Sequence, residues 1–124
     1  MSGPAWIAFV VAAAIGAPLR YLVDGAVSAR VDGGFPWGTL LINVTGSFTL
    51  GLLTGLALYH GFPKTSKVVL GTGFLGAYTT FSTFSFETVR LIEEGALARA
   101  LRNALGTLVM GASAGALGLA LATL

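Results

Sequence analysis

The chain has 124 residues, of which 55% are hydrophobic and only 10% are charged, with a formal net charge of +2 and a mean hydropathy of +0.85. A soluble domain of this size needs more charge to cover its surface, so residues 1–124 are expected to form a single membrane domain. The absence of cysteine and the presence of one histidine, His60, exclude a disulfide framework and a multi-histidine metal site. The scattered basic residues also exclude nucleic acid as an expected partner.

Four stretches of the chain contain no Asp, Glu, Lys or Arg, and each can supply the roughly 20 residues that a membrane-spanning helix needs. The sequence therefore predicts an all-α membrane protein with four transmembrane helices. The predicted helices lie near residues 4–27, 37–59, 67–92 and 99–123. The connections are short and contain glycine or proline, so consecutive helices are expected to be antiparallel, with both termini on one side.

The first predicted helix carries one basic residue, Arg20, in the sequence "GAPLRY" (16–21). Its guanidinium either reaches from a helix end to the lipid headgroups or holds a positive potential at the mouth of an anion path. No carboxylate precedes Asp24 in this helix. A proton- or cation-coupled carrier usually has a central acid, so the helix does not favour that class.

The second predicted helix carries three polar side chains on one face, because Thr39, Asn43 and Ser47 are spaced four residues apart. An amide or hydroxyl in hydrocarbon costs free energy unless it has a partner. The stripe therefore serves either hydrogen bonds between helices or a polar track across the membrane.

The third predicted helix contains "GAYTTFSTFSFE" (76–87), in which Thr and Ser crowd into mid-membrane positions. Threonine is β-branched and its hydroxyl competes for backbone hydrogen bonds, so a break in this helix is expected at mid-membrane. Non-helical backbone at membrane depth occurs where it lines a cavity or binds a ligand. Carbonyl groups freed by a break are hard oxygen ligands, which suit a hard cation such as Na⁺.

Two phenylalanines and one acid complete this segment. Phe81 and Phe84 are three residues apart and share a face. Aromatic ring edges carry partial positive charge, so these rings either line an anion path or pack in a core. Glu87 is the only acid well inside a predicted helix, and it is expected to pair with Arg90 one turn later or with Arg20.

The fourth predicted helix places Asn103 and Thr107 four residues apart, with Ser113 further along. Together with the second and third helices it offers mainly neutral hydrogen-bond donors, which suit an anion that must exchange its hydration shell. The patterns "GLLTG" (51–55) and "GASAG" (111–115) allow close approach of helices. These patterns are equally compatible with helix packing within one chain and with a homodimer interface.

Basic residues are distributed almost evenly between the two sides of the predicted topology. Four or five arginines lie on the side of the first and third connections, against two lysines on the other side. This small difference weakly favours termini outside, and it also permits insertion in both orientations.

The residues resemble those of the Fluc (CrcB) fluoride channels of bacteria and archaea. The resemblance is carried by "GAPLRY" (16–21), "PWGTLLINVTGSFTLGLL" (36–53) and "GTGFLGAYTTFSTFSFE" (71–87), and it covers nearly the whole chain. It implies a passive, fluoride-selective channel of the cell inner membrane that confers fluoride resistance. It also implies an antiparallel, dual-topology homodimer with two fluoride pathways and a central structural Na⁺.

The resemblance assigns these roles to particular residues. The backbone carbonyls of Gly76 and Thr79 are expected to bind Na⁺. The resemblance places the two phenylalanines, Asn43, Arg20 and Glu87 on the fluoride pathway, and the polar side chains of the second, third and fourth predicted helices supply the other residues expected to line it. Together these residues are Arg20, Thr39, Asn43, Phe81, Ser82, Thr83, Phe84, Glu87, Asn103 and Thr107.

Two other membrane functions compete with this interpretation. Small multidrug-resistance transporters are also dual-topology dimers of four-helix chains, but they depend on an acid in the first helix, and residues 1–19 contain none. A membrane scaffold subunit would use the same polar groups for packing alone. An enzyme is not expected, because the sequence offers no nucleophile with a base and no metal-ligand set.

Overall fold

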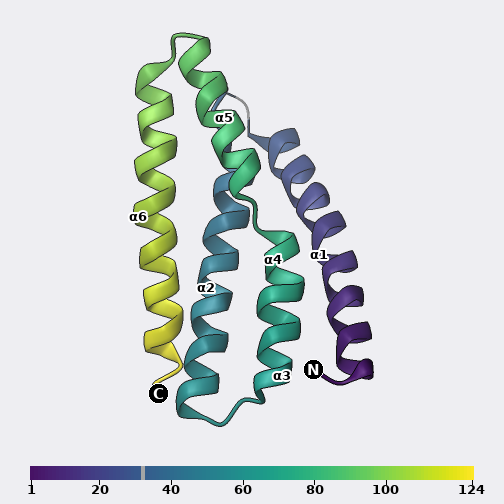
Figure 1. Ribbon diagram of the computed structural model, residues 1–124. Coiled ribbons are helices and arrows are strands. Elements are labelled where there is room, and N and C mark those ends of the chain that lie inside the picture. The colour runs from purple at the N-terminus through teal and green to yellow at the C-terminus, as the bar shows by residue number, and fades with distance from the viewer. Residues whose placement is uncertain (32) are drawn as a thin grey trace.

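The computed structural model describes residues 1–31 and 33–124, so position 32 of the first predicted connection, 30–36, lies outside the described residues. The described chain contains helices and no strand. In chain order the elements are α1 (Gly3–Arg30), α2 (Trp37–Tyr59), α3 (Lys64–Lys67), the π-helix η1 (Val68–Leu75), α4 (Gly76–Tyr78), α5 (Phe81–Glu93) and α6 (Leu97–Leu121). Figure 1 shows that successive long helices run in opposite directions and that both termini lie at the same end.

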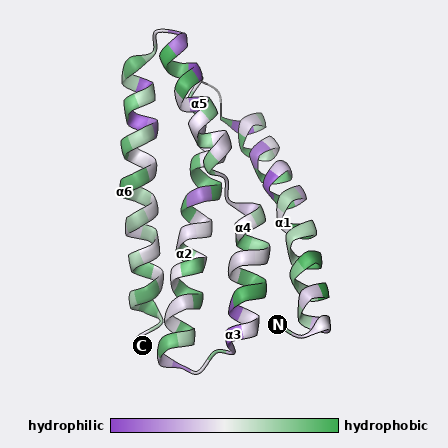
Figure 2. Cartoon of the chain, viewed as in Figure 1, coloured by the Kyte–Doolittle hydropathy of each residue, from purple (hydrophilic) through white to green (hydrophobic). Residues whose placement is uncertain are grey.

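Three of the described helices, α1, α2 and α6, are long and apolar enough to cross a membrane, with 28, 23 and 25 residues. At about 1.5 Å per residue, each exceeds the hydrocarbon thickness of about 30 Å. Large apolar side chains such as Ile7, Leu22, Leu58 and Leu108 are well exposed, as lipid-facing residues are. Hydrophilic residues gather at the α5–α6 turn, at α3 and in the second half of α1 (Figure 2). The chain is therefore a multi-pass membrane protein.

The helices begin and end at residues whose local conformational preferences favour a helix terminus. Ser2 caps α1 by accepting a hydrogen bond from the Ala5 amide at 3.3 Å. Pro36 precedes α2 and Pro63 precedes α3, where the missing amide hydrogen costs nothing. In the α5–α6 turn, Gly95 takes a positive φ of 77°, a conformation that favours glycine.

The segment from α3 to α5 is divided into short pieces and does not form one long helix. Its first half, η1 and α4, packs against α1 and contributes to a small core with α2. Its second half, α5, packs mainly against α6. The buried members of the core are Ile42, Leu53, Leu75 and Tyr78. The change of neighbour between the two halves moves α5 away from the axis of α4, as Figure 1 shows.

The two small-residue patterns pack α2 against α6 within one chain. A side chain at Gly51 would overlap the backbone of Gly115, and one at Gly118 would overlap the Phe48 carbonyl and lie 2.8 Å from the Leu52 amide nitrogen. Of the two alternatives left open by the sequence, the structure uses "GLLTG" and "GASAG" for intramolecular packing.

A Gly118→Ala variant is expected to lose stability, because its methyl group would push α6 away from α2. Overpacking of this kind costs about 1–3 kcal/mol. The measurement is thermal unfolding of the purified protein in detergent. Gly106→Ala is the matched control on the same helix, because beyond the nearby backbone of α6 no atom of the described residues lies within 4 Å of a Cβ there. Equal melting temperatures for the two variants would contradict the close α2–α6 approach.

Candidate functional site

The backbone leaves helical geometry between α4 and α5. Thr79 has φ −76° and ψ 159°, and Thr80 has φ −148° and ψ 118°, both in the extended region. The Thr79 amide still donates to the Leu75 carbonyl at 2.8 Å, which closes the last turn of the preceding helix. Thr80 begins the next one, because its Oγ1 accepts from the Thr83 amide at 3.1 Å. The hydroxyl therefore acts as an N-cap that starts α5 in a new direction.

Asn43 of α2 clamps the peptide groups of Thr80. Its Nδ2 donates to the Thr80 carbonyl at 2.9 Å, and its Oδ1 accepts from the Thr80 amide at 2.9 Å. Thr80 is buried, with 6% of its surface exposed. One side-chain amide therefore satisfies both backbone groups of Thr80.

A second attachment joins the same region to α2. The hydroxyls of Thr45 and Tyr78 lie 3.0 Å apart. Thr45 donates its single hydrogen to the Leu41 carbonyl at 2.7 Å, so the Tyr78 hydroxyl donates to Thr45. The Tyr78 ring stacks on Phe74 with centroids 6.0 Å apart. The residues on both sides of Thr79 are thus fixed to one helix.

The carbonyls of Gly76 and Thr79 are free to bind a cation. In a continuous helix the Thr80 amide would donate to Gly76, but here it donates to Asn43. Among the described residues, none of the hydrogen bonds outside the regular helices ends on either carbonyl. Two unpaired carbonyl oxygens beside the interruption fit the hard-cation site expected from the sequence.

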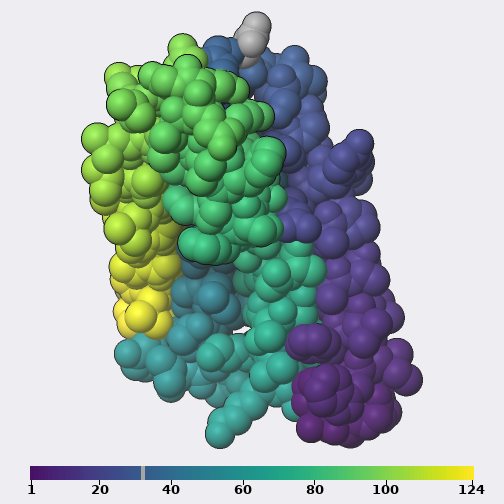
Figure 3. Space-filling model, turned by 45° about the horizontal axis from the view of Figure 1, so that its top comes forward, coloured from purple at the N-terminus to yellow at the C-terminus, as the bar shows by residue number. Residues whose placement is uncertain are grey.

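An open cavity of about 470 Å³ lies beside the interruption. Asn43 and Ser47 line it from α2, Phe81 and Phe84 from α5, and Thr107 from α6. The remaining lining residues are Gly46, Leu50, Gly71, Leu75, Gly76, Thr79, Thr80, Ala104, Leu108, Gly111 and Ala112. Figure 3 shows this face recessed below α5, where α2 forms the floor between α6 and the η1–α4 segment.

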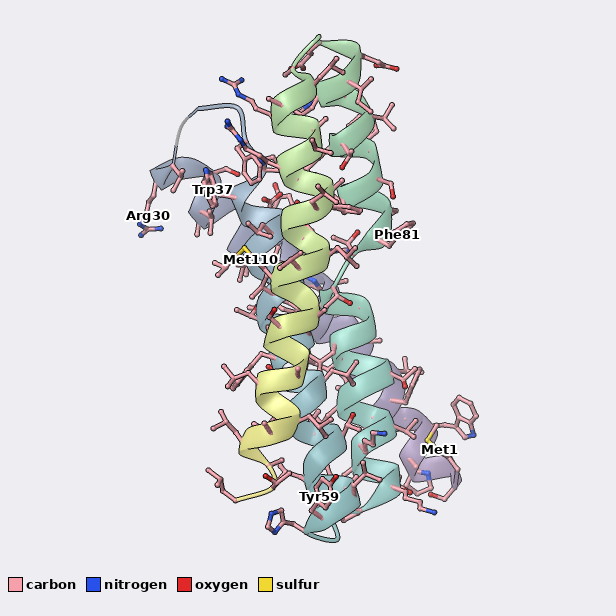
Figure 4. The ribbon with its side chains drawn as sticks, turned by 90° about the vertical axis from the view of Figure 1, so that its left-hand side faces the viewer. Met1, Arg30, Trp37, Tyr59, Phe81 and Met110 are labelled. Carbon is pink, nitrogen blue, oxygen red and sulfur yellow. The ribbon has the colours of Figure 1, made fainter. Side chains whose placement is uncertain are left out.

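The two phenylalanines stand at the edge of this cavity. Phe81 is 79% exposed and projects outward at mid-height, as Figure 4 shows, whereas Phe84 is half-buried. Their ring centroids are 5.8 Å apart with an interplanar angle of 45°. Neither ring belongs to the buried core cluster. Their edges can therefore meet a ligand that passes this point.

Thr107 differs from most threonines in the helices. Thr45, Thr49, Thr54 and Thr88 each donate to the carbonyl four residues earlier. The Thr107 Oγ1 is buried without a partner in the described chain, and the residue lines the cavity. An unsatisfied buried polar atom costs about 1–3 kcal/mol, so a ligand that accepted a hydrogen bond from this hydroxyl would recover that cost.

The Thr39 hydroxyl donates to Glu87 Oε1 at 2.5 Å, and Thr39 is 2% exposed. The expected ion pair of Glu87 with Arg90 or Arg20 is wrong. In the described chain Arg90 Nε instead lies 3.6 Å from Glu94 Oε1, at the favourable spacing of four residues.

The cavity gathers about half of the residues predicted to serve the site. Asn43, Phe81, Phe84, Thr107, Gly76 and Thr79 line it. Arg20, Thr39, Ser82, Thr83, Glu87 and Asn103 do not line it. Thr83 instead receives a hydrogen bond from the Thr80 hydroxyl at 3.0 Å, Ser82 is exposed, and Arg20 is half-buried on α1.

The sequence placed Ser47 on the same polar face as Thr39 and Asn43, and Ser47 lines the cavity. No individual role was predicted for Thr80, Thr45 or Tyr78. Thr80 carried a signal, since threonine is a preferred N-cap residue. The Thr45–Tyr78 hydrogen bond had no signal, because its partners are 33 residues apart.

Comparison with known proteins identifies the family. Residues 7–119 match the family described as CrcB-like protein, Camphor Resistance (CrcB). Three similar proteins are each named fluoride-specific ion channel FluC 1. The one from Leifsonia xyli is 47% identical over 91% of this chain and 82% of its own, and the one from Streptomyces avermitilis is 49% identical over 88% of each. The third, from Frankia casuarinae, is 48% identical over 94% of this chain and 95% of its own. The resemblance drawn from the sequence motifs is confirmed, and the chain belongs to the CrcB family.

Proposed function

We propose that this protein is a fluoride-selective passive channel that exports cytoplasmic fluoride across the plasma membrane. The observation that carries the proposal is the cavity, which Asn43, Thr107 and two phenylalanines line and to which none of the described residues contributes a carboxylate. Neutral donors and ring edges attract a small, strongly accepting anion. The names of the relatives support the same ion.

The driving force needs no coupling ion. Hydrogen fluoride enters a cell as a neutral weak acid and dissociates inside. A membrane potential that is negative inside then favours anion exit by about 2.3 kcal/mol per 100 mV. The protein only has to exclude larger anions, which a narrow set of donors achieves.

The pathway extends beyond the cavity in this proposal. The segment 64–93 forms the fourth membrane crossing, interrupted at Thr79 and Thr80. The bonded pair Thr39 and Glu87 lies one turn from Asn43 and Phe84 along α2 and α5. These two residues continue the pathway, together with Ser82 and Thr83, and Asn103 lies behind α5 beside it. The guanidinium of Arg20 supplies positive potential at its mouth.

The functional unit in this proposal is an antiparallel, dual-topology homodimer around one structural Na⁺. The small difference in basic residues between the two sides permits both orientations. The exposed ring of Phe81 offers an apolar surface to a second copy. The free carbonyls of Gly76 and Thr79, repeated in both copies, would hold the ion without any carboxylate.

Liposome flux tests the channel function directly. Liposomes that contain the purified protein and are loaded with fluoride and K⁺ should release fluoride when valinomycin is added, because K⁺ leaving through valinomycin balances the charge that leaves with fluoride. A fluoride electrode in the external solution would measure the release. The same vesicles loaded with chloride should retain nearly all of it, because the donors favour the smaller halide. Equal release of both ions would contradict selectivity, and no release above protein-free vesicles would favour a scaffold role.

Removing Na⁺ tests the structural ion. Replacing it with N-methylglucamine should weaken the dimer on a sizing column and lower fluoride flux, since a bulky cation cannot bind the carbonyls. Tracer ²²Na⁺ should not move with fluoride. Stoichiometric movement of the two ions would identify a symporter, and an unchanged dimer with unchanged flux would refute the structural site.

A further inference from the structure

Asn103 is fully buried, with 0% of its surface exposed, and it faces α5 and not the cavity. Its Nδ2 donates to Thr88 Oγ1 at 2.8 Å. Thr88 Oγ1 in turn donates to the Phe84 carbonyl at 2.8 Å. Two hydrogen bonds thus connect α6 to the backbone of one of the two phenylalanines at the cavity.

The direction of these bonds is fixed by chemistry. The Thr88 hydroxyl has one hydrogen, which goes to a carbonyl, so it can only accept from Asn103. The amide of Asn103 therefore turns its nitrogen toward Thr88. Its Oδ1 is buried and has no donor in the described chain. Fluoride is itself an acceptor and cannot satisfy this oxygen.

We propose that Asn103 and Thr88 form a relay that positions Phe84, so that Asn103 acts on transport through the ring and not by binding the ion. The inference rests on the proposed function and refines its pathway. The Phe84 carbonyl lies in the first turns of α5, directly after the interruption, where neighbouring turns give the least support. The bond from Asn103 of α6 reaches this carbonyl through the Thr88 hydroxyl, so it fixes the α5 turn from Phe84 to Thr88 against α6.

The relay makes a distinctive prediction about stability. Asn103→Leu has a similar shape and removes the unsatisfied oxygen, so the melting temperature of the protein should not fall. A residue kept only for packing would leave flux unchanged in this variant. The relay instead predicts a three- to tenfold loss of fluoride flux per folded dimer, because the hydrogen bond from Asn103 to Thr88 no longer holds the turn that carries Phe84 in position.

A double-mutant cycle tests the coupling. Thr88→Val should lower flux as Asn103→Leu does, and the combined variant should be no slower than either one. In a Phe84→Ile background, neither substitution should lower flux further. Thr88→Ser keeps the hydroxyl and should restore the wild-type rate. Thr49→Val is the matched control, because Thr49 also donates to the carbonyl four residues earlier, at 2.8 Å, but no amide bond to its hydroxyl is described.

The outcomes separate the relay from the channel function. Losses that multiply in the combined variant, or that persist in the Phe84→Ile background, would show that Asn103 acts independently of Thr88 or Phe84 and would overturn the relay. Wild-type flux in both Asn103→Leu and Thr88→Val would overturn it as well, while leaving the channel function intact. Absence of fluoride flux from the unmodified protein would refute the proposed function, and the relay with it.

Discussion

Replacing Phe81 or Phe84 by isoleucine is expected to lower fluoride flux per folded dimer by a factor of ten or more. Isoleucine keeps apolar bulk but lacks the ring edge with its partial positive charge. A tenfold loss corresponds to about 1.4 kcal/mol on the transport barrier, which is a reasonable contribution for one anion contact. Flux would be measured with a fluoride electrode and normalised to dimer recovered from a sizing column.

Stability should change little in the same variants. Phe81 is 79% exposed and Phe84 is half-buried, so a volume-conserving change costs at most about 1.5 kcal/mol. Phe86→Ile is the matched control, because Phe86 lies on the same helix, is 67% exposed and does not line the cavity. Thr65→Ala in α3 should also leave flux unchanged. Wild-type flux in both Phe81→Ile and Phe84→Ile would return these rings to a packing role.

Asn43→Ala is expected to cause the largest loss of both stability and flux. It removes both hydrogen bonds to Thr80, so a buried amide and a buried carbonyl lose their partner together. Each unsatisfied group costs about 1–3 kcal/mol, which predicts a total loss of about 2–6 kcal/mol. Thermal unfolding in detergent and liposome flux on the surviving dimer would measure the two effects separately.

Thr54→Val serves as the control for this prediction. Thr54 lies on the same helix, but among the described residues its hydroxyl donates only to the Leu50 carbonyl of its own helix, at 2.8 Å. This variant should retain wild-type stability and flux. If Asn43→Ala unfolded at the same temperature as Thr54→Val, the hydrogen bonds between Asn43 and Thr80 would not be what supports the interrupted backbone.

Much of the architecture follows from local properties of the sequence. Charge-free stretches locate the long apolar helices α1, α2 and α6, because hydrocarbon tolerates few charges over 30 Å. The hydroxyl-rich stretch "TTFST" draws attention to the position where the backbone becomes extended, because threonine competes with helical hydrogen bonding. These signals act over a few residues and need no knowledge of neighbouring helices.

Contacts between distant residues could not be predicted in this way. The expected pair of Glu87 and Arg90 rested on spacing alone. Thr39, 48 residues away, donates to the carboxylate of Glu87, while Arg90 pairs with Glu94. The orientation of the Asn103 side chain could not be predicted from the sequence either. Its place on a polar face indicated the cavity, but the rotation of α6 against α5 turned it toward Thr88.

The hydrogen bonds of Asn43 have a consequence for how the stretch from Gly76 to Thr80 can vary. Asn43 binds the amide and carbonyl of residue 80, so its contacts do not depend on which side chain that residue carries. Tyr78, by contrast, is attached through its own hydroxyl, two positions earlier. Deleting or inserting one residue between these attachments would bring a different peptide group to Asn43. These two attachments therefore fix the number of residues between Tyr78 and Thr80, whatever side chain lies between them.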